Sequence, residues 1–99
     1  MRVEYHDEVL RRLAEELRYA PKGWDPTVIT SYRKKVQLIS AARDERDLYE
    51  MRGLRMEKLK GDRLGGQTSM RLNDQFRLIL TFKTYRDRVA VLLEVVDYH

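Results

Sequence analysis

The sequence predicts a single α+β domain over residues 1–99, with two to three N-terminal helices packed on a short antiparallel β-sheet. In the first half, apolar residues recur at intervals of three or four, which is the period of a helix. In the second half, apolar and polar residues alternate, which is the period of a strand with one buried face. No repeat or linker separates the two halves, so we expect one domain.

The chain begins with a short alternating run, residues 2–5, which predicts a first strand. Asp7 is the expected N-cap of a helix over residues 8–17. Three apolar residues at four-residue spacing should form the buried face of this helix: Val9, Leu13 and Leu17. Pro21 and Gly23 then interrupt the helical pattern.

A second helix is expected through residue 43, with Asp25 as its N-cap and Pro26 at its first position. Its buried stripe follows the helical period: Ile29, Tyr32, Val36 and Ile39. Asp44 is expected to cap a last short helical turn that ends at Gly53.

Three strands should form the second half as an antiparallel meander. In the first strand of this meander, residues 68–73, Met70 and Leu72 are expected to face inward. Three residues are expected to face outward: Ser69, Arg71 and Asn73. A turn at Asn73 and Asp74 leads to the second strand. Its expected inward residues are Phe76, Leu78, Leu80 and Phe82, and its outward residues are Arg77, Ile79 and Thr81.

Residues 88–96 predict the third strand and are apolar on both faces except for Glu94. A strand that is apolar on both faces is typical of the centre of a sheet. We therefore expect it to be a central strand, with the helices packed on one face of the sheet and Arg71 and Arg77 on the other.

The composition restricts the classes of function. There are 20 Lys and Arg residues against 16 Asp and Glu, a net charge of +4, which favours a polyanionic partner such as RNA or DNA. The alternative is a solvated basic surface. No stretch approaches the roughly 18 apolar residues of a membrane helix. The charged first twenty residues do not resemble a signal peptide, so we expect no membrane association and a cytoplasmic location.

No cysteine is present, so the chain offers neither a disulfide nor a thiolate. No cluster of His and carboxylate residues has the spacing of metal ligands, which predicts no metal site.

The densest local motif is the basic, glycine-bearing segment LKGDRLGG at residues 59–66. Backbone N–H groups and cationic side chains in such a loop suit contact with phosphate. Two cations of this segment, Lys60 and Arg63, and the adjacent Lys58 are candidate RNA-binding residues. A solvated connection between strands explains the segment equally well.

Arg71 and Arg77 fall on the same predicted face, across a hairpin. Two guanidiniums on one face can hold a phosphate and stabilise negative charge in a transition state. The alternative is that each forms a surface ion pair with Asp or Glu, which contributes little to stability.

The chain ends with Asp97, Tyr98 and His99, directly after the apolar third strand. The His99 imidazole titrates near neutrality and can transfer a proton. Asp97 can orient it, and Tyr98 can stack on a base or bind a phosphate. The alternative is a solvated tail. His6, the other histidine, has no expected chemical role.

Three motifs occur in order: LKGDR at 59–63, SMRLNDQFR at 69–77 and the terminal DYH. Together they resemble the HigB-type toxins of bacterial toxin–antitoxin systems, within the RelE/ParE superfamily. The resemblance is close in the second half and extends to the first half in general layout. It implies a compact α+β fold and cleavage of messenger RNA on the translating ribosome, without a metal or cofactor. It also implies a helix-turn-helix antitoxin and operator binding by the toxin–antitoxin complex.

The resemblance also implies roles for individual residues. Asp97, Tyr98 and His99 match functional positions of the family, and Lys60 and Arg77 match positions that hold basic residues for RNA. HigB enzymes can carry a histidine three residues before the loop lysine, where this sequence has Glu57. Glutamate can act as a base but, when ionised, donates no hydrogen bond.

The expected reaction is attack of an RNA 2′-hydroxyl on the adjacent phosphorus, which gives a 2′,3′-cyclic phosphate and a free 5′-hydroxyl. His99 would transfer a proton, assisted by Glu57 or Asp97. Three cations would balance the charge on the phosphoryl oxygens: Lys60, Arg71 and Arg77. Two alternatives are a gyrase-poisoning toxin on the same scaffold and a non-cleaving member that binds antitoxin and operator DNA.

Overall fold

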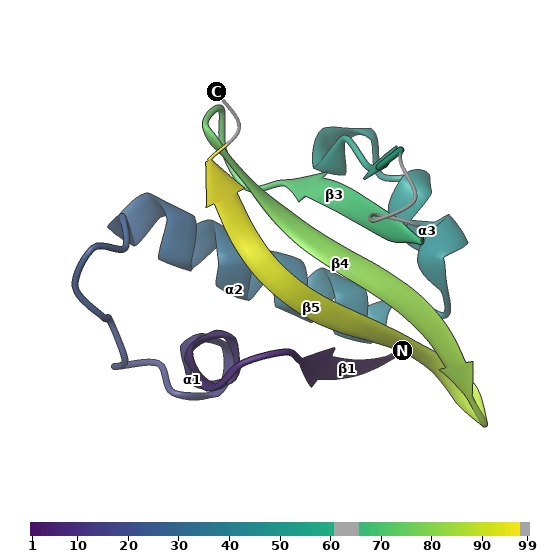
Figure 1. The fold of residues 1–99 in the computed structure, drawn as a ribbon, viewed down its shortest axis with the longest axis horizontal. Helices are drawn as coiled ribbons and strands as arrows, with labels where there is room; N and C mark the ends of the chain where they lie inside the picture. The colour runs from purple at the N-terminus through teal and green to yellow at the C-terminus, as the bar shows by residue number, and fades with distance from the viewer. Residues whose placement is uncertain (61–65, 98–99) are drawn as a thin grey trace.

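The computed structural model describes residues 1–60 and 66–97, which form helices packed against a five-stranded sheet (Figure 1). The strands are β1 (Arg2–Tyr5), β2 (Glu57–Lys58), β3 (Gln67–Arg71), β4 (Phe76–Tyr85) and β5 (Asp87–Asp97). The helices are α1 (Glu8–Glu15), α2 (Pro26–Ala41), α3 (Glu45–Tyr49) and a 3₁₀ turn, η1 (Arg52–Leu54). The predicted α+β class is confirmed.

The strands follow the order β1-β5-β4-β3-β2. The antiparallel meander of β3, β4 and β5 is confirmed, and β5 has neighbours on both sides, as its apolar sequence predicted. The sheet is mostly antiparallel, as predicted, and β1 joins β5 in parallel. Parallel strands need a long connection, which α1, α2 and the rest of the chain provide.

The core lies between the helices and one face of the sheet. Figure 1 shows α2 passing behind β4 and β5. Tyr32 of α2 is fully buried and belongs to this core. Its hydroxyl donates a 2.8 Å hydrogen bond to the carbonyl of Leu10, which links α2 to α1. The sheet supplies buried residues on the same side: Met70, Leu78, Leu80 and Leu92.

Each predicted N-cap is confirmed. Asp7 accepts a hydrogen bond from the Leu10 amide at 2.8 Å, and Asp25 accepts one from the Thr27 amide at 2.7 Å. Asp44 begins α3 in the same way, with a 2.9 Å bond from the Arg46 amide. A carboxylate in this position satisfies an amide that the helix itself cannot pair, which explains why the helices begin where they do.

The end of α1 differs from the prediction. The helix stops at Glu15, and Glu16 has extended backbone angles (φ −114°, ψ 99°). Leu17 therefore lies outside the helix and is 78% exposed, so its predicted place in the core is wrong. The predicted burial of Leu13 is confirmed, and Leu10 is buried on the same helix.

The end of the last helical turn also differs from the prediction. Helix α3 ends at Tyr49, and Gly53, the predicted end, lies inside η1. The turn ends at Arg55, which has left-handed backbone angles (φ 45°, ψ 53°).

Three residues expected on an outward face are buried: Ser69 completely, Ile79 at 6% exposed and Arg77 at 8% exposed. Ser69 and Arg77 cover each other, because the Arg77 side chain lies against Ser69 and hydrogen-bonds to it. Parity correctly put both residues on the side of the sheet opposite the core, but their exposure was wrong.

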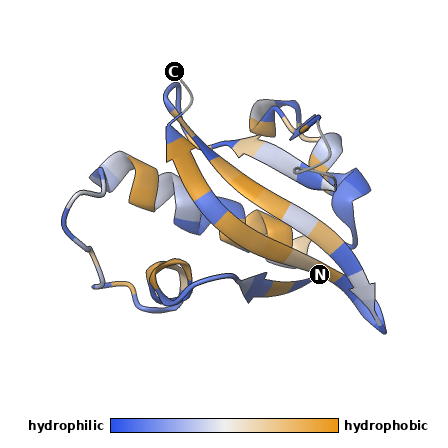
Figure 2. Ribbon diagram, viewed as in Figure 1, coloured by the Kyte–Doolittle hydropathy of each residue, from blue (hydrophilic) through white to orange (hydrophobic). Residues whose placement is uncertain are grey.

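Hydrophobic residues run along the middle of β4 and β5, whereas the turn that joins these two strands is hydrophilic (Figure 2). Within the described ranges, no helix has both the length and the apolar character needed to cross a membrane.

Candidate functional site

Two of the predicted cations, Arg71 and Arg77, lie together on the side of the sheet opposite the helical core. We call this side the second face and define it by Glu57, Ser69, Arg71 and Arg77. Arg71 of β3 is in register with Arg77 of β4, and Glu57 of β2 is in register with Ser69 of β3. Directly opposed side chains start about 5 Å apart, so the sheet brings these residues into one small area.

Arg77 is the most enclosed cation of this group. Its Nε donates to the Ser69 hydroxyl at 2.9 Å, and its Nη2 donates to the Ser69 carbonyl at 3.3 Å. Nη2 also donates to the carbonyl of Arg55, at the end of η1. The guanidinium therefore reaches from β4 across β3 to the turn that precedes β2. It holds a positive charge on the second face and fixes the segment that carries Glu57.

Arg71 is more exposed and pairs with Asp74 in the β3–β4 turn. Nearby, burial and the positive charges of Arg71 and Lys34 lower the pKa of Lys35 on α2. The positive charges of Arg71 and Lys35 thus lie close enough to repel one another.

Asp97 lies at the same end of the sheet as Arg77 but not on the second face. It is in register with Phe76, whose side chain packs against the core, whereas Arg77 points the other way. The Asp97 carboxylate accepts a 2.9 Å hydrogen bond from the Gln75 side chain. Gln75 belongs to the β3–β4 turn, in which the Asn73 side chain accepts bonds from two backbone amides. The structure therefore places Asp97 beside the turn and not beside Glu57.

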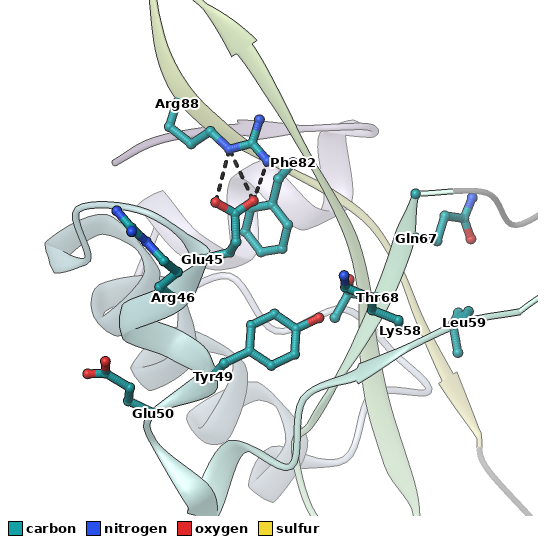
Figure 3. Close-up of a pocket in the computed structure, with 11 residues that line it drawn as sticks. Glu45, Arg46, Tyr49, Glu50, Lys58, Leu59, Gln67, Thr68, Phe82 and Arg88 are labelled. Carbon is teal, nitrogen blue, oxygen red and sulfur yellow. Dashed lines mark hydrogen bonds and ion pairs between the residues drawn. The ribbon is translucent and has the colours of Figure 1, made fainter.

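Lys58 is also separated from the second face. It is in register with Thr68 and lines a cleft of about 910 Å³ between α3 and the sheet (Figure 3). Tyr49 points into this cleft from α3, and Phe82 of β4 also lines it. Since the cleft is on the helical side, a ligand there would not contact Arg77.

An ion pair closes one side of the cleft. Arg88 of β5 donates to both carboxylate oxygens of Glu45 on α3 (Figure 3). Hydrogen bonding from Arg88 lowers the pKa of Glu45, against a smaller opposing effect of burial. The pair attaches α3 to the end of the β4–β5 hairpin.

Of the remaining predicted residues, the structure describes only Lys60. Lys60 is exposed, two residues after the end of β2. Arg63, Tyr98 and His99 lie outside the described residues. Of the predicted site, the structure thus brings together Arg71, Arg77 and Glu57.

Two residues of this area were not singled out from the sequence. Ser69 shares the parity of Arg71 and Arg77, and that alternation was a usable signal for it. The sequence contains no signal for Arg55, because its neighbours do not indicate that its backbone is left-handed. In residues 1–60 and 66–97, no group of three His, Asp or Glu residues is arranged to hold a metal ion.

The fold is also found in a known toxin. The chain superposes on the YoeB/ParE toxin from Agrobacterium tumefaciens with a TM-score of 0.62 and 12% sequence identity, over 100% of both chains. At that identity the likeness concerns the fold alone. No curated protein sequence matches the chain.

A family model supplies the evidence from sequence. The model for the RelE-like toxin of the type II toxin–antitoxin system HigB matches residues 3–99, which is nearly the whole chain. The chain therefore belongs to the HigB-like family of RelE-like type II toxins.

Proposed function

We propose that this toxin is an endoribonuclease that cleaves messenger RNA on the ribosome and inhibits translation in the cytoplasm, without a metal ion or cofactor. The observation that carries the proposal is the register of β2, β3 and β4, which groups Glu57 with Arg71 and Arg77 on the second face. A carboxylate beside two guanidiniums suits proton transfer next to a phosphate that gains charge.

The proposed reaction is an internal transfer at phosphorus. The 2′-oxygen loses its proton and attacks the adjacent phosphorus, while the bond to the 5′-oxygen breaks and that oxygen gains a proton. The products are a 2′,3′-cyclic phosphate and a 5′-hydroxyl, and no water or oxidant is consumed. Either Glu57 or His99 accepts the proton, and His99 donates one to the leaving oxygen.

The cations have different parts in this proposal. Arg71 and Lys60 are exposed enough to contact phosphate, with Lys58 and Arg63 as further RNA-binding candidates. Arg77 supplies positive charge from a buried position and holds the Arg55 turn in place. Asp97 and Tyr98 keep their proposed catalytic roles through His99, the neighbour that they would orient and support.

Membership of a type II family implies an antitoxin partner. We propose that this antitoxin is a helix-turn-helix protein and that the complex binds its own operator DNA. The basic composition of the toxin, with a net charge of +4, is consistent with a nucleic-acid ligand.

The test is single-turnover cleavage of ribosome-bound messenger RNA by the wild type and a His99→Gln variant. Glutamine keeps a polar side chain but cannot titrate, so the rate should fall about 10²–10⁴-fold, the usual contribution of a positioned acid or base. Melting temperature and antitoxin binding, measured in parallel, should stay unchanged because a terminal residue contributes little to folding.

The products distinguish the alternatives. A 2′,3′-cyclic phosphate on the upstream fragment supports internal attack. Intact messenger RNA with wild-type protein, together with inhibition of DNA supercoiling by gyrase, would replace the nuclease proposal with gyrase poisoning. A wild-type rate in His99→Gln would transfer the proton chemistry to Glu57.

A further inference from the structure

Among the residues that the structure describes, two arginines have left-handed backbone conformations, Arg55 at φ 45° and Arg86 at φ 65°. A side chain in this region crowds the neighbouring backbone, so glycine and asparagine are the residues usually found there. Arg86 lies in the β4–β5 turn, where a tight reversal of the chain requires such a conformation. Arg55 ends η1 two residues before Glu57, beside the proposed site.

The backbone of Arg55 is held by hydrogen bonds on both sides. Its amide donates to the Arg52 carbonyl at 3.1 Å, and its carbonyl accepts a hydrogen bond from the buried Arg77 guanidinium. The preceding residue, Leu54, is buried in the core. The strained conformation is therefore imposed by the surrounding structure, and strain of this kind concentrates at functional sites.

The side chain of Arg55 is exposed. Within residues 1–60 and 66–97, its guanidinium forms no hydrogen bond or ion pair, whereas Arg71 pairs with Asp74 and Arg88 with Glu45. A fixed backbone thus presents, beside the second face, a positive charge that has no ion-pair partner among the described residues.

We infer that Arg55 is an RNA-binding residue of this toxin, whose guanidinium contacts a phosphodiester group beside the second face while Arg77 fixes its position. The inference rests on the proposed function, since it requires an RNA ligand. Guanidinium is suited to this contact because its donors match two phosphate oxygens at once. The phosphodiester can belong to the messenger or to ribosomal RNA.

The test separates charge from backbone strain with two substitutions at each position. Arg55→Gly removes the charge and relaxes the turn, whereas Arg55→Gln removes the charge and keeps the strain. Arg86→Gly and Arg86→Gln are the matched controls, because Arg86 has the same conformation in the β4–β5 turn, outside the proposed site. Affinity is measured for ribosomes programmed with a 2′-O-methylated messenger, which lacks the attacking hydroxyl, and for vacant ribosomes.

Both Arg55 variants should bind programmed ribosomes about tenfold more weakly, the effect of removing one charge-assisted hydrogen bond. The slope of log affinity against log salt should become shallower by roughly 0.7 for each phosphate of a single strand that the variant no longer binds. Arg55→Gly and Arg86→Gly should both melt no lower than the wild type. Both Arg86 variants should keep wild-type affinity and salt slope, which a general effect of charge removal would not allow.

Weaker binding confined to programmed ribosomes assigns the phosphodiester to the messenger, and an equal weakening on vacant ribosomes assigns it to ribosomal RNA. Wild-type affinity and salt slope in both Arg55 variants, alongside normal cleavage by the parent, would overturn this inference and leave the proposed function intact. A parent that neither binds ribosomes nor cleaves RNA would instead overturn the proposed function, and the inference with it.

Discussion

At the scale of single residues, Arg77 is a buried charged side chain that belongs to the proposed site. It is 8% exposed and bonded to both the hydroxyl and the carbonyl of Ser69. Burying a guanidinium is unfavourable unless its donors are satisfied. Here the Ser69 hydroxyl accepts from Nε, and the carbonyls of Ser69 and Arg55 accept from Nη2. Arg77 therefore contributes to folding and to the proposed site together.

Arg77→Ala should lower the free energy of unfolding by about 1–3 kcal/mol, because it leaves buried acceptors without their donor. Arg77→Lys should recover only part of this, since an ammonium cannot reproduce the guanidinium fork. Urea unfolding at neutral pH measures both.

The control is Arg71→Ala, in register with Arg77 on the neighbouring strand. Arg71 pairs with an exposed Asp74, and exposed pairs contribute about 1 kcal/mol or less. An Arg77→Ala protein as stable as Arg71→Ala would contradict the structural role of the buried guanidinium.

At the scale of elements, α3 is short, and an ion pair with a residue distant in sequence supports it. Five residues form too few helical hydrogen bonds to be stable alone. Asp44 caps the helix, Leu48 is buried beneath it, and Glu45 pairs with Arg88 on β5. The position of α3, and with it one wall of the cleft, depends on these attachments.

Glu45→Gln should therefore destabilise the protein at neutral pH. The pKa of Glu45 is lower in the folded state than its ordinary value of 4.5, chiefly through hydrogen bonding to Arg88. The stabilisation is then present above the unfolded pKa and is lost as pH falls through the folded pKa.

The difference in unfolding free energy between wild type and Glu45→Gln should accordingly shrink as pH is lowered from about 7 to about 3. Glu50→Gln is the matched control: Glu50 lies at the C-terminal end of the same helix and is exposed. A gap that is independent of pH would show that Glu45 acts through packing and not through its charge.

At the scale of the whole molecule, the sheet separates two surfaces. The helical side contains the core and the cleft beside α3, and the second face carries Glu57, Arg71 and Arg77. Because the antitoxin of a type II system must restrain the toxin, the proposed nuclease should be harmful whenever the partner is missing.

Expression of the chain alone should arrest growth and deplete messenger RNA, and co-expression of the cognate antitoxin should restore growth. The control is His99→Gln, which should accumulate without arresting growth. Messenger RNA levels and culture density after induction measure this. Normal growth with abundant wild-type protein and intact messenger RNA would contradict the nuclease proposal.

Local sequence was sufficient for much of this fold. Asp7, Asp25 and Asp44 begin their helices because a cap depends on residues only two or three positions away. The strands of the second half follow an alternation that is equally local, and its parity placed Arg71 and Arg77 on one face. The motifs that resemble HigB toxins also lie within short stretches, and the family assignment agrees with them.

Only the tertiary structure decided how distant segments meet. The parallel pairing of β1 with β5 joins residues at the two ends of the chain, and no local pattern specifies it. The burial of Arg77 depends on Ser69 on the next strand and on the Arg55 carbonyl, 22 residues away. Alternation predicts which face a side chain occupies, but its exposure depends on what the rest of the chain places over that face.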